Sequence, residues 1–120
     1  MSKPTLVLGA SLNPGRYSNL AVRRLAEHGH RVVAVGRRDG SIGAVPVVTG
    51  LPADLEVDTI TLYLNPDNQQ AWHARIVALR PQRVIFNPGS EDAKFAAMLA
   101  SNDIEVVEGC TLVMLAVGTF

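Results

Sequence analysis

Residues 5–18 read TLVLGASLNPGRYS, and this stretch decides the fold. The apolar run Thr5–Gly9 is typical of a buried parallel strand. The residues after it are rich in Gly, Ser, Asn and Pro, which favours a loop. Ser18 suits the N-cap of an amphipathic helix that continues to about His28. The stretch therefore predicts a strand, a loop and a helix in direct succession.

The same alternation continues along the chain. Short apolar runs predict further buried strands at 31–36, 59–64, 83–87 and 104–107. The segment 45–48 is also strand-like, but Pro46 cannot donate a ladder hydrogen bond, which suits an edge strand. Helices are predicted from the N-cap Asn65 to just before Pro81, from the N-cap Ser90, and over 112–117 with Thr111 as its cap.

This order of elements indicates an α/β protein. We expect one Rossmann-like domain over residues 1–120. Its sheet should be doubly wound and mostly parallel, with five to six strands, helices on both faces and strand order 3-2-1-4-5-6.

Composition excludes several classes of protein. Hydrophobic residues make up 48% of the 120, enough for a core, and the formal net charge is zero. A nucleic-acid or membrane-surface partner usually requires a basic excess, so we expect neither. The single cysteine, Cys110, and the lack of an export segment indicate a cytoplasmic protein. Cysteine and histidine spacings predict no metal site.

Three connections are expected to converge at the carboxyl ends of the strands. They span residues 9–18, 64–66 and 87–90, and each leads into a helix. Ligands of doubly wound sheets bind at this edge, near the topological switch point. Backbone N–H groups at helix N-termini attract anions, so the sequence predicts an anion site here.

The first connection carries the polar groups for such a site. Gly9 permits a tight turn, while Ser11 and Asn13 offer hydrogen bonds to a phosphate and Arg16 offers a charged one. Ser18 either caps its helix or bonds the phosphate.

The dinucleotide fingerprint G-x-G-x-x-G is not met, because Ser11 stands at its second glycine. The acidic residue expected after the second strand is replaced by Arg37 and Arg38. A basic pair suits a ribose phosphate, which both NADP and CoA carry.

The chain resembles the CoA-binding domain family, which includes small stand-alone proteins and the N-terminal domain of the succinyl-CoA synthetase alpha subunit. The residues that carry the resemblance are Gly9-Ala-Ser11, Pro14, Ser18, the run 27–35, Ile42-Gly43, Leu64-Asn-Pro66 and Gly109-Cys110. The resemblance implies CoA phosphates on the first loop and adenosine near the end of the second strand. The cofactor-binding residues it implies are Gly9, Ala10, Ser11, Asn13, Arg16, Ser18, Gly36, Arg37, Arg38, Leu64, Asn65, Pro66, Asn87, Pro88 and Gly89.

Three functions remain open at this stage. The first is a small cytoplasmic CoA or acyl-CoA binding protein, non-catalytic or regulatory. The second is an NADP-binding oxidoreductase or sensor, for which Tyr17 or Tyr63 would donate the proton. The third is a protein-interaction domain with a vestigial nucleotide cleft, whose apolar tail at 112–120 packs on a second copy or another protein. No residue pattern identifies a catalytic group, so binding is favoured over catalysis.

Overall fold

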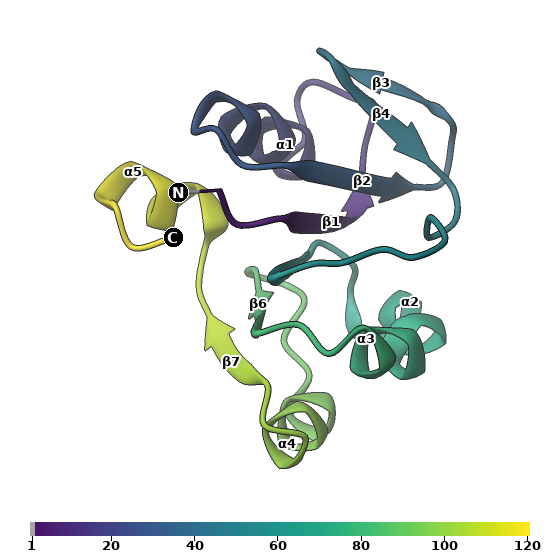
Figure 1. Ribbon diagram of the computed structural model, residues 1–120, viewed down its shortest axis with the longest axis vertical. Coiled ribbons are helices and arrows are strands. Elements are labelled where there is room, and N and C mark those ends of the chain that lie inside the picture. Colours follow the sequence, from purple (N-terminus) through teal and green to yellow (C-terminus); the bar gives the residue numbers. More distant parts are fainter. Residues whose placement is uncertain (1) are drawn as a thin grey trace.

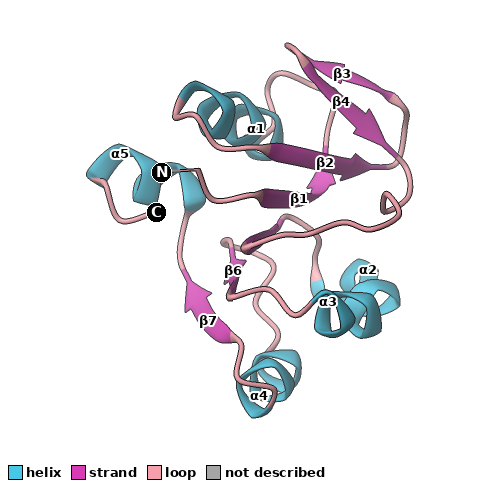
Figure 2. Ribbon diagram, viewed as in Figure 1, coloured by secondary structure: helices cyan, strands magenta, loops and turns pink. Residues whose placement is uncertain are grey.

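The computed structural model describes residues 2–120 (Figure 1). Its strands are β1 (Thr5–Ala10), β2 (Val32–Gly36), β3 (Gly40–Ile42), β4 (Val45–Val48), β5 (Thr59–Leu62), β6 (Arg83–Phe86) and β7 (Glu105–Glu108). Its helices are α1 (Tyr17–Glu27), α2 (Pro66–Gln69), α3 (His73–Leu79), α4 (Ala93–Ser101) and α5 (Thr111–Val117), and a 3-10 turn (Gln70–Trp72) joins α2 to α3. Figure 2 shows how these helices flank the strands.

The described strands form one sheet in the order β3-β4-β2-β1-β5-β6-β7. Every neighbouring pair is parallel except β3 with β4. Without β3 this is the predicted order, and the predicted fold class is confirmed with one strand more than expected. The chain moves outward from β1 to β4 and then returns to β5 on the other side of β1. The topological switch point therefore lies between β1 and β5.

The extra strand, β3, corrects the prediction for residues 45–48. That segment is not at the edge, because β3 pairs antiparallel with β4 and covers it. The sequence Gly40-Ser-Ile42 has no apolar run, so it gave no strand signal of its own. Pro46 is tolerated next to β2, because β2 pairs only with Val47 and Val48 beyond it.

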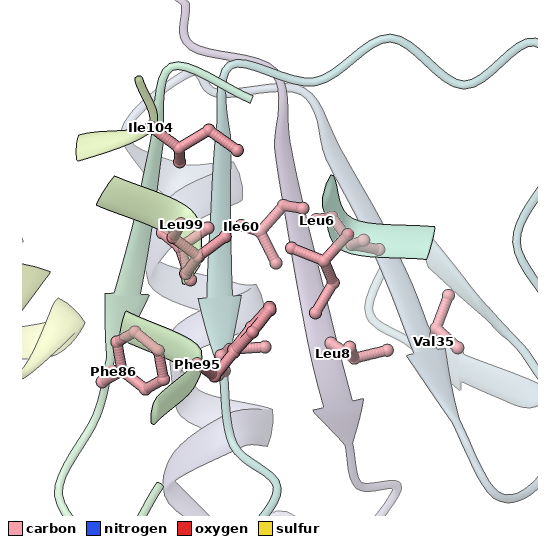
Figure 3. Packing of buried hydrophobic residues seen from close by; sticks show 11 residues of the cluster. Leu6, Leu8, Val35, Ile60, Phe86, Phe95, Leu99 and Ile104 are labelled. Carbon is pink, nitrogen blue, oxygen red and sulfur yellow. The ribbon is translucent and has the colours of Figure 1, made fainter. Parts of the chain in front are cut away.

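A hydrophobic core lies on each face of the sheet. On one face α3 and α4 cover the strands, and Figure 3 shows Phe95 and Leu99 of α4 packed over Ile60 and Phe86. On the other face α1 and α5 pack with the strands through Val22, Leu25, Leu115, Val7 and Ala34. Each fully buried Val, Leu, Ile or Phe side chain in these cores contributes roughly 1.5–3 kcal/mol. Within residues 2–120, no helix is both long and apolar enough to cross a membrane.

Helix α1 does not begin as predicted. Its helical hydrogen bonding starts at Arg16, whose carbonyl accepts from the amides of Asn19 and Leu20. Arg16 therefore occupies the N-cap position and Ser18 lies buried within the first turn. The prediction of Ser18 as the N-cap is wrong, because the preceding loop turns into the helix two residues earlier.

The other helix starts test three more predictions. Asn65 caps α2 as expected, since its side-chain oxygen accepts from the Asn68 amide at 2.9 Å. Ser90 does not cap α4, because Asp92 lies closer to the helix and accepts from the Phe95 amide at 3.0 Å. Thr111 does not cap α5 either. It is the first helical residue, and its hydroxyl pairs instead with Thr61 in the protein interior.

Candidate functional site

The connections after β1 and β5 lie against each other at the switch point. Gly9 has a φ of +96°, in the region that favours glycine. A Cβ atom there would lie 3.0 Å from the carbonyl carbon and oxygen of Tyr63 and 3.1 Å from a methyl carbon of Leu64. The Tyr63 amide also donates to the Leu8 carbonyl at 2.9 Å. Glycine at position 9 therefore lets the two strand ends meet.

The end of β2 adjoins the same loop on its other side. Ala10 pairs with Gly36 where the register between β1 and β2 shifts. A Cβ atom on Gly36 would lie only 2.2 Å from the Ala10 carbonyl oxygen. Arg37 and Arg38 follow directly and are exposed, and their side chains form neither a hydrogen bond nor an ion pair with the other described residues, 2–120. The basic pair is therefore available to an anionic ligand.

The polar side chains of the first loop also hold its backbone in shape. The Ser11 hydroxyl oxygen accepts from the Asn13 amide at 3.1 Å. The Asn13 side-chain oxygen accepts from the Gly15 amide at 2.9 Å. In each case the acceptor is used, while the Ser11 hydroxyl hydrogen and the Asn13 side-chain NH₂ have no partner within residues 2–120. These donors, with the exposed Arg16, suit an anion.

Two residues that sequence reasoning missed secure this loop. Asn19, which is buried in α1, donates to the Ser11 carbonyl at 2.9 Å and accepts from Arg23 at 3.0 Å. Leu12 packs over β3, with two of its methyl carbons 2.8 Å from the position of a Cβ atom on Gly40. The sequence signal for Asn19 was its place three residues before Val22, on the apolar face of the helix.

Three helices, α1, α2 and α4, begin at this edge of the sheet. Among the described residues, α1 alone of these three starts without a capping side chain. It also has no acidic residue in its first turn. Asn65 and Asp92 already occupy the N-termini of α2 and α4. At the starts of α2 and α4, one first-turn amide each, that of Asn68 and that of Phe95, is therefore already taken by a capping side chain. The uncompensated positive end of the α1 dipole lies at the first loop.

The third connection, residues 87–90, mainly stabilises the fold and offers few free polar groups to a ligand. The buried Asn87 amide donates to the Thr61 hydroxyl at 2.6 Å and to the Leu62 carbonyl at 2.8 Å. Its oxygen accepts from the Thr111 amide at 2.9 Å. The side chain of Asn87 is thus committed to the protein, while Pro88 and Gly89 are exposed in the turn.

Tyr63, considered above as a proton donor, has a poor environment for that role. Its ring packs on the core face beneath α1 and α5, and its hydroxyl is buried without a hydrogen-bond partner within residues 2–120. Burial raises the pKa of Tyr63 to about 12. A phenol held so firmly in its protonated form is a weak acid for catalysis near neutral pH.

Two hollows lie away from this loop. One, of about 280 Å³, is lined by residues 52–57 and by residues at the amino ends of β1 and β2, opposite the carboxyl edge. The other, of about 300 Å³, lies between the start of α3 and the start of α4. Neither is lined by a residue of the first loop. Phosphate recognition by a helix N-terminus needs directed N–H groups more than an enclosed cavity, so the loop remains the candidate site.

The fold and this edge of the sheet define a doubly wound α/β protein with an open helix N-terminus at its switch point. The family model of the CoA binding domain matches residues 3–116. The chain therefore belongs to the CoA-binding domain family.

Several solved structures share the fold, whereas none of the curated proteins matches the chain. An uncharacterised protein is 47% identical, with a TM-score of 0.95, over 100% of this chain and 99% of its own. A Thermus thermophilus protein, cell-free ID.343, is 27% identical, with a TM-score of 0.84, over 99% of this chain and 91% of its own. A hypothetical protein from Pyrococcus horikoshii OT3 shares the fold, with 18% identity and a TM-score of 0.83 over 93% of this chain and 80% of its own.

Proposed function

We propose that this protein binds CoA or an acyl-CoA and has a non-catalytic or regulatory role. The pyrophosphate would lie on the first loop, residues 9–18. The observation that carries the proposal is the start of α1, which has neither a capping side chain within residues 2–120 nor an acidic residue in its first turn. An anion at that position would satisfy the first amides of the helix and interact with its dipole.

The exposed pair Arg37 and Arg38 supports CoA in particular. The pair follows the strand that contacts the first loop through Gly36 and Ala10, so it borders the same edge of the sheet. CoA carries a phosphate on its ribose, separate from the pyrophosphate. We infer that the two guanidinium groups bind this ribose phosphate through charged hydrogen bonds.

NADP also carries a ribose phosphate, and it remains the second candidate ligand. The loop departs from the glycine pattern of dinucleotide sites at Ser11. In addition, the high pKa of the buried Tyr63 argues against its use as the proton donor of an NADP-dependent reaction. Both features favour CoA.

Titration calorimetry with CoA, dephospho-CoA and NADP tests the proposal. We expect CoA to bind and dephospho-CoA to bind about tenfold more weakly, because it lacks the phosphate assigned to the arginine pair. Replacing both Arg37 and Arg38 by Ala should abolish this difference. Arg24→Ala is the matched control, because Arg24 is exposed on α1 and pairs with Glu27, and this variant should retain the difference. Absence of CoA binding at millimolar concentration would overturn the proposed function.

A further inference from the structure

A single buried amide, that of Gln69, joins two of the three connections around the candidate site. Gln69 is the last residue of α2 and is fully buried. Its side-chain nitrogen donates to the Leu64 carbonyl at 3.1 Å and to the Ser90 carbonyl at 2.9 Å. Leu64 belongs to the turn after β5, and Ser90 ends the turn after β6. The amide therefore fixes the separation of these two turns.

The orientation of this amide follows from its surroundings. Two carbonyl oxygens face it, and a carbonyl needs a donor, so the NH₂ group must point toward them. The side-chain oxygen of Gln69 then faces the Nε2 atom of His73 at 2.9 Å. Because this oxygen can only accept, Nε2 must carry a hydrogen. The network therefore specifies the Nε2–H form of the His73 ring.

His73 is itself held by the core. Its ring stacks on Phe95, with centroids 3.6 Å apart and planes 9° from parallel. Phe95 in turn meets Phe86 edge-on, with centroids 6.1 Å apart. Burial lowers the pKa of His73, an effect that the Asp92 carboxylate opposes. A neutral imidazole held in a fixed plane thus donates to the Gln69 oxygen and supports the orientation that the two carbonyls set.

The other end of this chain of contacts reaches the phosphate loop. Leu64, whose carbonyl Gln69 holds, has a side-chain methyl carbon 3.1 Å from the position of a Cβ atom on Gly9. The Ser90 turn is rigid, since the Ser90 amide and hydroxyl both donate to the Asn87 carbonyl, at 2.9 and 2.7 Å. A change at Gln69 would therefore move the two turns relative to each other.

We propose that Gln69 is a positioning residue for the part of the ligand that lies beyond its phosphates. This inference rests on the proposed function. In CoA that part is the pantetheine arm, a chain with two amides that ends in a thiol. Its contacts with the protein would depend on the separation of the two turns. The arm would lie between the turns at Leu64 and Ser90. The phosphates would rest on the first loop, whose backbone is held by Ser11, Asn13 and Asn19 and not by Gln69.

The test compares CoA with adenosine 3′,5′-bisphosphate, which lacks the arm. In the variant Gln69→Leu we expect CoA to bind about tenfold more weakly and the bisphosphate to change by less than about twofold. His73→Phe keeps an aromatic ring on Phe95 but removes the donor to Gln69, so a smaller loss in the same direction is expected. Gln70→Leu is the control, because the neighbouring Gln70 is exposed, and it should behave as wild type.

Long-range ¹H–¹⁵N spectra of the His73 ring give an independent readout. The wild type should show the Nε2–H form, and Gln69→Leu should show a mixture of both neutral forms. Equal weakening of both ligands in Gln69→Leu, or no weakening of either, would overturn the positioning role. If the wild type binds neither ligand, the proposed function itself fails, which is a distinguishable result.

Discussion

Gly36→Ala is expected to destabilise the protein severely. The added methyl group would lie 2.2 Å from the Ala10 carbonyl oxygen and 3.3 Å from a methyl carbon of Val47. The first of these is a backbone atom of the neighbouring strand, which cannot move aside without disturbing the pairing of β1 with β2. Overpacking of a core costs about 1–3 kcal/mol, and a collision with backbone should reach or exceed the upper end of that range.

Urea denaturation of Gly36→Ala measures this effect. The matched control is Gly50→Ala, because Gly50 has nothing within 4 Å of a Cβ position among the described residues and its φ is not in the left-handed region. The control should remain within about 0.5 kcal/mol of wild type. If Gly36→Ala is as stable as the control, β1 and β2 do not approach each other as described.

Asn87→Ala should be the second severe change. Its side chain forms hydrogen bonds with Thr61 and Leu62 of β5 and with Thr111 at the start of α5. The Thr61 hydroxyl keeps its bond to Thr111, but the Leu62 carbonyl and the Thr111 amide lose the Asn87 side chain. At about 1–3 kcal/mol for each group, a total loss of about 2–6 kcal/mol is expected. The start of α5 should also loosen, since the Thr111 amide loses its acceptor.

Denaturation and amide hydrogen exchange together check this prediction. Asn102→Ala is the control, because Asn102 is exposed and its side chain donates only to the Met98 carbonyl at 2.8 Å. We expect a loss of less than about 1 kcal/mol in the control. Similar losses in both variants, or an unchanged exchange rate at Thr111 in Asn87→Ala, would contradict the structural role of Asn87.

The order of the sheet could be predicted because its strands are apolar runs separated by clear loops. The Thr5–Gly9 run and the connection after it placed the switch point correctly. The strand β3 could not be found in this way. Its pairing with β4 depends on a neighbouring segment, and Leu12 from a distant loop packs over Gly40 within it.

The helix starts show where local patterns stop being sufficient. Ser18, Ser90 and Thr111 are all good capping residues, yet none of them caps. In each case a nearby residue holds the N-cap position. The Ser90 hydroxyl donates to the Asn87 carbonyl within its own turn, and the Thr111 hydroxyl pairs with Thr61 across the core. A preference scale ranks residues at a cap but cannot choose between candidates a few positions apart.

The convergence of the three connections at one edge of the sheet could be predicted, but the contacts within them could not. Sequence alone indicated the three connections, because parallel strands end at one edge of a sheet. The roles of Asn19 and Gln69 could not be derived, since both depend on carbonyl groups of residues 8 and 21 positions away in the sequence, Ser11 and Ser90. The commitment of the Asn87 side chain likewise depends on its packing against β5 and α5.

The most direct test of the central claim is a ¹H–¹⁵N correlation spectrum of the protein titrated with CoA. We predict the largest shifts at residues 9–18 and 36–38, smaller ones at 64–66 and 87–90, and almost none at 52–57, which line the hollow at the opposite edge of the sheet. Shifts centred on residues 52–57, or on the hollow between α3 and α4, with an unchanged first loop would contradict the account.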